Sequence, residues 1–344
     1  MSANDPEANV LEREHLVRYS DLRPCRNAFV DTRTPGSEQK ENFTIIGPGV
    51  SENPDQYVHI SRPHGFNIGG ARQPPGCVNS QHSHLTAEVF IVHSGQWVFR
   101  SGERARDGEV LLAPGDVVSL PPNMFRGFEN VGDGMGFLFA VLGGDDPGRV
   151  LWAPDVFDAA EKHGLILLEN GRLIDTTLGK AAPLGARQMP RTTPAQVAAL
   201  DTYDSAALAR CVWRPGGAAA GSPSSVLSAS GPGLREFPVL GASNESEGLE
   251  AGVIKRTHGF VLRQLTFGPG ASVPAHTRAE EEVLLVHRGA VRVGVREESI
   301  ELHQGDVLTV PVGSPRTFSN ERSDDAIVHM VRRGERPSPP VFLT

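Results

Sequence analysis

The sequence predicts an all-β protein made of two tandem β-barrels, with a few short helices in the segment that connects them. Three observations carry this prediction: an internal repeat relates the two halves, strand-like runs alternate with turns, and 38 Gly and 27 Pro supply the turns. A chain of 344 residues is also long enough for two domains that each bury a core.

The internal repeat is the strongest of these observations. The pattern Ile-x-Arg-x-His-Gly-Phe at residues 60–66 recurs at residues 254–260, an offset of 194 (254 − 60). Farther along, the offset falls to 190 (305 − 115), which corresponds to a four-residue deletion in the intervening hairpin. Because so many identities align in register, we infer a duplicated barrel. The pairs that matter below are His82 and His276, Glu88 and Glu282, and Arg126 and Arg316.

Composition and the repeat divide the chain into four parts. We expect an N-terminal arm, a first barrel with the candidate site, a connector and a second barrel with a degenerate site. Their boundaries are residues 1–40, 41–150, 151–235 and 236–344, respectively. Residues 11–17 of the arm are predicted to form a short helix, and residues 44–46 and 57–60 are predicted to be the first strands.

The connector differs in character from the barrels. Residues 154–162 are predicted to form a helix, because Pro154 stands at its start and a glycine follows its end. The dipeptide Asn-Gly at 170–171 predicts a tight hairpin over residues 166–176. A second short helix is predicted over 193–200, and the small residues of 216–228 predict a mobile linker.

Overall charge and cysteine content exclude several function classes. A net charge of −8 gives no reason to expect binding to nucleic acid or to an anionic membrane. The three cysteines are widely separated, which favours reduced thiols over a disulfide framework. The N-terminus lacks the pattern of a signal peptide and no apolar run would span a bilayer, so a cytoplasmic protein is expected.

The residues with chemical potential lie between Gly76 and Gly95. His82 and His84 are two apart on strand-like sequence, so both imidazoles point to the same face. After a short polar turn, Glu88 opens an apolar run that is predicted to be the antiparallel return strand. Two neutral imidazoles and one carboxylate suit a first-row divalent metal with open coordination positions. The alternative is a pair of structural histidines beside a strand carboxylate.

Here the sequence resembles the cupin superfamily. The fixed positions of the first cupin motif are all matched, by Gly76, His82, His84, Glu88 and Gly95. The second motif normally reads Gly, five residues, Pro-x-Gly, two residues, His, three residues, Asn. In this chain Asn123 replaces its second glycine, and Arg126 replaces the histidine that usually gives the fourth metal ligand. The resemblance implies a bicupin fold with an incomplete four-ligand site.

Two roles remain open for Arg126. It would either pair with Glu88 and weaken the metal site, or stay free and bind the negative group of a substrate. In the second case Arg126 orients the substrate and Glu88 also takes part in catalysis. The predicted pocket wall consists of Asn79, Gln81, Phe90, Trp97, Phe99, Met124 and Phe128. Packing alone is the other interpretation of each wall residue.

The second copy of the motif has lost one of its ligands. Arg278 replaces the second histidine, so His276, Arg278, Glu282 and Arg316 occupy the ligand positions. Two guanidiniums directed at one carboxylate repel a dication. We therefore expect a metal-free, structural site in the second barrel.

Within the superfamily, an intact first motif in only the N-terminal barrel is most similar to the gentisate and hydroxynaphthoate dioxygenases. That similarity implies a metal-dependent oxidoreductase, a dioxygenase acting on a small anionic and potentially aromatic substrate. Fe(II) is the favoured metal, with Mn, Ni, Co and Zn as alternatives. A metal-dependent isomerase or decarboxylase and a non-catalytic ligand-binding bicupin are the alternative functions. The family habit implies a homodimer or higher homo-oligomer.

Overall fold

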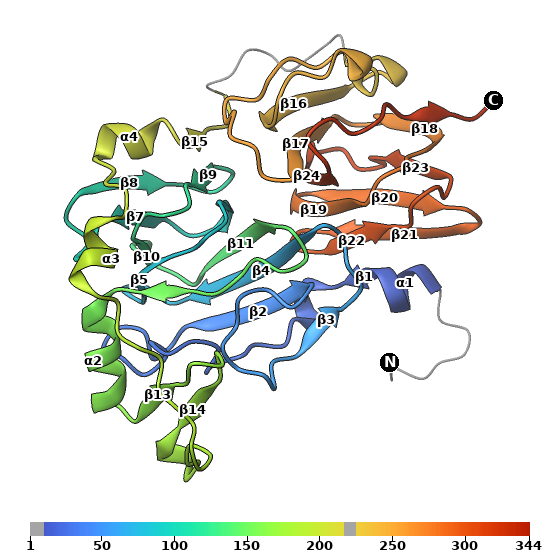
Figure 1. Cartoon of the computed structure of the whole chain (residues 1–344). Coiled ribbons are helices and arrows are strands. Elements are labelled where there is room, and N and C mark those ends of the chain that lie inside the picture. The colour runs from blue at the N-terminus through green and yellow to red at the C-terminus, as the bar shows by residue number, and fades with distance from the viewer. Residues whose placement is uncertain (1–9, 217–224) are drawn as a thin grey trace. The chain divides into compact units, whose positions relative to one another are not determined.

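The structure is a computed structural model that describes residues 10–216 and 225–344, and the chain forms two compact units (Figure 1). Among the described residues, the N-terminal unit comprises residues 23–61 and 67–212, and the C-terminal unit comprises residues 10–22, 62–66, 213–216 and 225–344. Part of the predicted arm thus belongs to the C-terminal unit, whereas the predicted connector up to residue 212 belongs to the N-terminal unit. Most of the predicted linker at 216–228 lies outside the described residues.

Two separate sheets face each other in the N-terminal unit. Their strands are β2 (Glu41–Ile46), β3 (Val58–Ile60), β4 (Phe66–Gln73), β5 (Val78–Ser83), β6 (Glu88–Ser94), β7 (Trp97–Ser101), β8 (Gly108–Leu112), β9 (Val117–Leu120), β10 (Arg126–Asn130), β11 (Gly136–Gly143), β12 (Leu151–Trp152) and β15 (Val212–Trp213). The seven-stranded sheet has the order β15-β9-β6-β11-β4-β2-β3, and the five-stranded sheet has the order β12-β5-β10-β7-β8. The chain alternates between the sheets, as in a jelly roll.

The C-terminal unit repeats this arrangement. Its elements are α1 (Val10–His15), β1 (Leu16–Val17), β16 (Leu234–Leu240), β17 (Phe260–Phe267), β18 (Ser272–Thr277), β19 (Glu282–Arg288), β20 (Ala290–Val295), β21 (Glu298–His303), β22 (Val307–Val310), β23 (Arg316–Ser319), β24 (Ala326–Arg333) and β25 (Val341–Phe342). The sheet orders are β1-β22-β19-β24-β17-β16 and β21-β20-β23-β18-β25. Strand β1 pairs antiparallel with β22, which ties residues 16–17 to this unit.

The helices predicted in the connector are confirmed. α2 (Pro154–Lys162) has the predicted bounds, and Gly164 follows it with a φ of 79° that favours glycine. The predicted hairpin is formed by β13 (Leu165–Leu167) and β14 (Leu173–Asp175). α3 begins at Pro194 and ends at Ala198, and the preceding Thr193 forms a capping box with Gln196. The remaining short elements are α4 (Ser205–Ala209) and four 3₁₀ turns at Tyr19–Asp21, Thr176–Leu178, Ser228–Ser230 and Glu245–Glu247.

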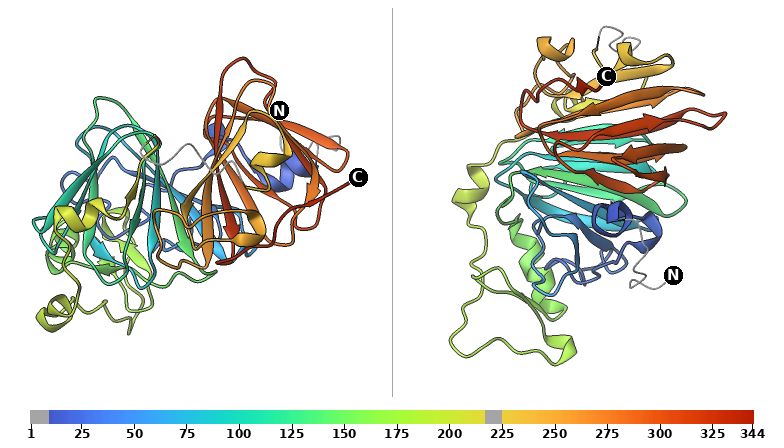
Figure 2. Two further views of the ribbon diagram at one scale, coloured as in Figure 1. Left: turned by 90° about the horizontal axis from the view of Figure 1, so that it is seen from above. Right: turned by 90° about the vertical axis from the view of Figure 1, so that its right-hand side faces the viewer.

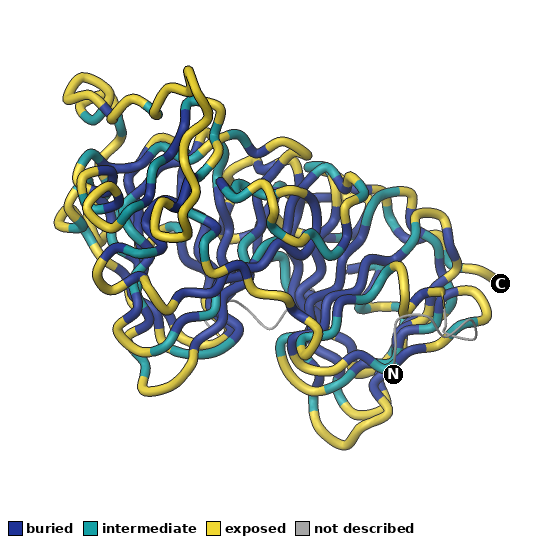
Figure 3. Tube along the Cα trace, turned by 90° about the horizontal axis from the view of Figure 1, so that it is seen from below, coloured by how far each residue is buried: buried dark blue, intermediate teal, exposed yellow. Residues whose placement is uncertain are grey.

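Each unit encloses its own core between its two sheets. The prediction of an all-β, jelly-roll-like chain is confirmed, although the sheets face each other as separate layers and do not close into barrels (Figure 2). Buried residues follow the strands, and exposed residues lie mainly in the loops (Figure 3). No helix in the described part of the chain has the length and apolarity needed to span a membrane.

Candidate metal centre

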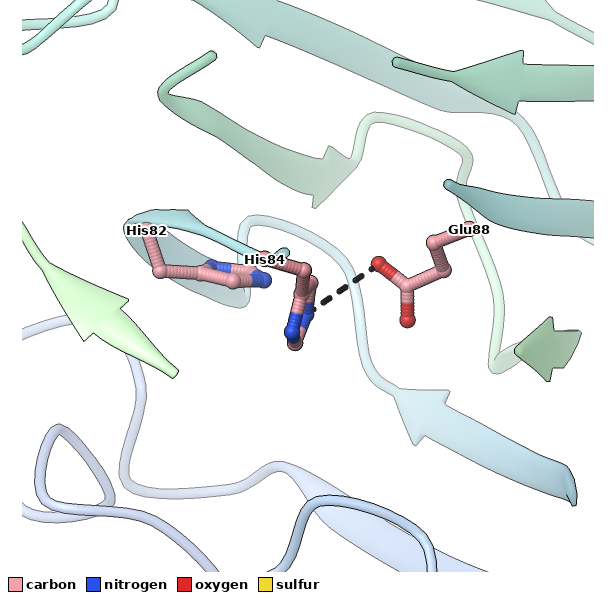
Figure 4. A group of neighbouring side chains, drawn as sticks. All are labelled: His82, His84 and Glu88. Atoms are coloured by element: carbon pink, nitrogen blue, oxygen red, sulfur yellow. Dashed lines mark ion pairs between the residues drawn. The ribbon is translucent and has the colours of Figure 1, made fainter. Parts of the chain in front are cut away.

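Two strands from facing sheets bring the predicted ligands together. His82 lies on β5 of the five-stranded sheet, His84 follows directly after it, and Glu88 opens β6 of the seven-stranded sheet. Their ligand atoms all lie within 4.8 Å of one another, and this is the one such cluster among the described residues. All three side chains are buried, and the Nε2 atom of His84 lies 3.5 Å from Oε2 of Glu88 (Figure 4).

Both imidazoles are neutral. Burial lowers the pKa of His82 to about 3, and the positive charge of Arg126 acts in the same direction. The same two causes hold the pKa of His84 well below its usual value. Nδ1 of His82 donates a hydrogen bond to the backbone carbonyl of Ser80 at 2.7 Å, because a carbonyl can only accept. The lone pair of His82 is therefore on Nε2, as metal ligation requires.

The donor set fits a divalent cation. Nδ1 of His84 is buried without a hydrogen-bond partner, so this ring is not committed to a structural bond on that side. Two neutral imidazoles and a carboxylate supply three protein ligands and leave other coordination positions open. His82, His84 and Glu88 are the residues that would hold the metal.

Of the two roles considered for Arg126, the structure shows the first: its guanidinium pairs with the carboxylate of Glu88. Its Nη2 lies 3.3 Å from Oε2 of Glu88, and its Nη1 donates to the carbonyl of Met124 at 3.4 Å. The side chain is fully buried and is not among the residues that line the pocket beside the histidines. Burial raises the pKa of Glu88, and the pairing with Arg126 opposes that rise. Arg126 thus partly neutralises the carboxylate of Glu88, a candidate ligand, from outside the pocket.

A pocket of about 80 Å³ opens beside the three ligands. Its wall includes the predicted residues Asn79, Phe90 and Phe128 together with His82, His84 and Glu88. The other four predicted wall residues lie elsewhere. Trp97, Phe99 and Met124 are in the packed core, and the amide of Gln81 donates to the backbone carbonyls of Arg100 and Gly102.

Much of the wall comes from segments that the sequence did not single out. Phe29 precedes the first strand of the N-terminal unit, and residues 49–51 and Val150 belong to loops. The ring of Trp152 lies 5.3 Å from that of His82, and its Nε1 donates to the carboxylate of Glu52 at 2.7 Å. No motif marks these positions; only the folded chain brings them to the histidines.

The corresponding positions in the C-terminal unit hold an ion-pair network. Glu282 is fully buried and lies 3.2 Å from Arg316 and 3.5 Å from Arg278, with Arg332 at 3.9 Å. Burial alone would raise the pKa of Glu282, but the three guanidiniums together lower it. Arg278 and Arg332 also share the carboxylate of Glu247. Guanidiniums therefore fill the space where ligands to a metal would converge.

Known proteins resemble this chain in sequence and in fold. Germin-like protein subfamily 1 member 4 of Arabidopsis thaliana is 29% identical over 144 residues, which cover 39% of this chain and 63% of that protein. An oxalate decarboxylase of Lactobacillus farciminis, solved as a formate complex, covers 99% of this chain and 90% of its own at 11% identity, with a TM-score of 0.55. Oxalate decarboxylase from Bacillus subtilis at pH 4.6 has a TM-score of 0.54 at 12% identity and covers 98% of this chain and 81% of its own.

At these identities the solved structures show the shared fold alone, and the match spans less than two thirds of the germin-like protein. The family described as Cupin domain matches twice, at residues 71–142 and 263–332. One match lies in each half of the internal repeat and in each of the two units of the structure. The chain therefore belongs to the cupin superfamily and is a bicupin.

Proposed function

We propose that this bicupin is a metal-dependent enzyme, a dioxygenase that acts on a small substrate in its N-terminal pocket. The observation that carries the proposal is the convergence of His82, His84 and Glu88 within 4.8 Å beside a pocket. Two imidazoles and one carboxylate are the ligand set of non-haem iron oxygenases, so Fe(II) is the proposed metal. Mn(II) is the main alternative, and one solved Bacillus subtilis oxalate decarboxylase is described by its Mn(II) centres.

The metal would supply Lewis acidity and redox chemistry, and the chain positions the reactants. The hydrogen bond from His82 to the carbonyl of Ser80 fixes the tautomer and the orientation of that ring. Arg126 fixes the carboxylate of Glu88. The indole of Trp152 packs against His82 and, with Phe90 and other apolar neighbours, limits the access of water.

A second candidate function is non-oxidative: a metal-dependent decarboxylase or isomerase. The observation that favours it is the position of Glu88, whose carboxylate lines the pocket and lies within reach of a bound substrate as an acid or base. A third candidate is a ligand-binding bicupin without catalysis. It is favoured by the pairing of Arg126 with Glu88, because that ion pair reduces the charge available to a metal.

Metal content tests the shared premise of the two enzymatic functions. We expect about one equivalent of a transition metal per chain in protein purified without added metal, measured by elemental analysis. His82→Ala should retain less than a tenth of that amount. His276→Ala is the matched control, because it removes the histidine of the C-terminal unit that corresponds to His82, and its metal content should equal that of the wild type. Wild-type protein that neither retains nor takes up metal supports the third function instead.

Oxygen uptake separates the two enzymatic functions. The Fe(II)- and Mn(II)-loaded proteins are incubated with a panel of small hydroxylated aromatic compounds and their carboxylated analogues, while dissolved oxygen and released carbon dioxide are recorded. A dioxygenase consumes oxygen in proportion to product, and His84→Ala should not. Release of carbon dioxide or isomerisation without oxygen uptake would replace the dioxygenase with the second candidate.

A further inference from the structure

The pocket in the N-terminal unit lacks a positively charged wall. Among the described residues that line it, the ionisable side chains are the two neutral histidines and Glu88. Apolar contacts dominate, because five aromatic rings contribute to the wall. These rings belong to Phe29, Phe43, Phe90, Phe128 and Trp152.

The two cations that lie just behind this wall are each bound to a carboxylate. Arg126 pairs with Glu88, and the fully buried Lys40 pairs with Asp31. Lys40 also donates to Oδ1 of Asn79 at 3.0 Å. The side chain that lines the pocket here is therefore the uncharged amide of Asn79, and the ammonium group of Lys40 lies behind it. An anion that enters this pocket without a metal would lose its hydration and face a carboxylate, and both effects are unfavourable.

Besides Nδ1 of His84, two polar side-chain atoms at the pocket have no hydrogen-bond partner among the described residues. Nδ2 of Asn42 is a buried donor and Oε1 of Gln56 is a buried acceptor, and both side chains line the pocket. The backbone of Asn42 is satisfied by Cys25, which leaves its side-chain amide for another partner. Only 8% of Asn42 is exposed, and a buried polar group without a partner is unfavourable. A ligand with complementary groups would remove that cost.

The duplication shows that these neutral positions are not required by the fold. At the same offsets as before, Asn42 corresponds to Glu236, Gly69 to Arg263 and Leu142 to Arg332. The strand registers agree, because Asn42 pairs with Ala71 as Glu236 pairs with Leu265. The C-terminal unit therefore places charged side chains at three positions that line the pocket as neutral residues in the N-terminal unit.

We propose that the N-terminal pocket binds a small uncharged molecule with an apolar body and an amide-like polar end, which accepts a hydrogen bond from Asn42 and donates one to Gln56. The inference rests on the proposed function in taking this pocket as the substrate site. It replaces the anionic substrate expected from the sequence, because the arginine that was to bind the anion is paired with Glu88. Asn42 is thereby the residue that determines specificity for the uncharged end.

The test compares amides with carboxylates of the same shape. Benzamide and benzoate form one pair, and isobutyramide and isobutyrate form a smaller pair. Binding to metal-stripped protein at pH 7.5 is measured by ligand-observed NMR titration. We expect each amide to bind at least tenfold more tightly than its carboxylate. Comparison of the two amides reports which size the pocket accepts.

Variants identify the residue responsible. Asn42→Asp keeps the shape and removes the donor, so the affinity for the preferred amide should fall at least tenfold; Asn42→Leu serves if that variant does not fold. Asn170→Asp is the matched control, because it makes the same change at an exposed turn residue outside this pocket, and its affinity should change less than threefold. Circular dichroism verifies that each variant is folded.

Three results would overturn the inference: carboxylates that bind as tightly as the amides, an Asn42→Asp variant with wild-type affinity, or no saturable binding of either amide. None of these depends on metal, because the protein is metal-stripped. If the protein binds no metal but still prefers the amides, the proposed function is refuted and the inference about the pocket stands. Adding Mn(II) to the amide-bound protein gives an independent readout, since a metal held by His82 and His84 should broaden the resonances of the bound amide.

Discussion

The two units of this bicupin share a strand order and differ in what their interiors contain. In the N-terminal unit, two neutral imidazoles and one carboxylate border an apolar pocket, and a single arginine pairs with that carboxylate. In the C-terminal unit, three guanidiniums surround the corresponding carboxylate, Glu282. The same fold can therefore hold either a candidate ligand site or a closed ion-pair network in its interior. A few inward-facing side chains determine which of the two forms.

Charge balance is the physical condition that the closed network must meet. A buried guanidinium is costly unless it is paired and hydrogen-bonded. Arg278 and Arg332 meet this condition by sharing Glu247, and Arg316 does so with Glu282 and the carbonyls of two neighbouring residues. Each carboxylate is therefore needed by more than one cation, which leads to the first prediction.

Glu282→Gln should destabilise the protein by about 3–5 kcal/mol, because it leaves three buried guanidiniums without their shared charge. Glu88→Gln should cost less than half as much, since Glu88 is paired with only one arginine. The free energy of unfolding is measured by chemical denaturation of the metal-free proteins. Equal losses in the two variants would show that the two interiors are energetically alike.

Glu52 of the N-terminal unit and Glu282 of the C-terminal unit should contribute to the pH dependence of stability with opposite signs. Glu52 of the N-terminal unit accepts hydrogen bonds from the backbone of Val30 and from Trp152, yet burial raises its pKa to about 8. The paired Asp31 and Lys40 act on it in opposite directions. The folded chain thus keeps a proton that the unfolded chain releases near pH 4.5, so this contribution is complete below pH 4.5 and is lost as pH rises to about 8.

Between pH 6 and 9, the wild type should lose about 2–3 kcal/mol relative to Glu52→Gln, whose side chain does not titrate, at 1.36 kcal/mol per pKa unit. Unfolding free energies of both proteins across this range provide the measurement. Parallel profiles would contradict the prediction. The lowered pKa of Glu282 contributes in the other direction: its stabilisation is present above pH 4.5 and is lost as pH falls through its folded value.

The smallest expected effect concerns the second departure from the cupin motif. Arg126→His should tighten metal binding about tenfold, roughly 1.4 kcal/mol, because it adds an imidazole and frees Glu88 from its ion pair. Arg316→His is the matched control in the C-terminal unit and should bind no metal, since Arg278 and Arg332 still surround Glu282. Competition with a chelator measures the affinity. Unchanged affinity in Arg126→His would mean that the arginine does not limit the site.

Local sequence was sufficient to place the ligands but not the whole pocket wall. His82, His84 and Glu88 converge as predicted, because period-two spacing and a short turn fix their faces. Gln81 immediately precedes His82 and points to the opposite side, toward the carbonyls of Arg100 and Gly102. Asn79 lies an odd three residues before His82, yet it lines the pocket.

A shift in strand register explains Asn79. Across β10 and β5, Arg126 pairs with His82 and Phe128 pairs with Asn79, so β5 carries one extra residue between the pairs. Such a bulge changes the face on which the following residues lie. Trp97 and Phe99 illustrate a second limit: they point into the unit but pack in its core. The period of two along a strand predicts which face of the sheet a residue lies on. It does not predict whether that residue reaches the pocket or packs in the core.

The sequence by itself determined the duplication, the jelly-roll-like strands, the three candidate ligands and the replacement of one histidine ligand by Arg278 in the second copy, because repeats, turns and alternation are local properties of a chain. Only the tertiary structure decided that Arg126 pairs with Glu88, that Trp152 stands beside His82 and that Asn42 faces the pocket with an unpaired amide. These contacts join residues far apart in the chain, and their geometry depends on how two facing sheets and their loops pack together.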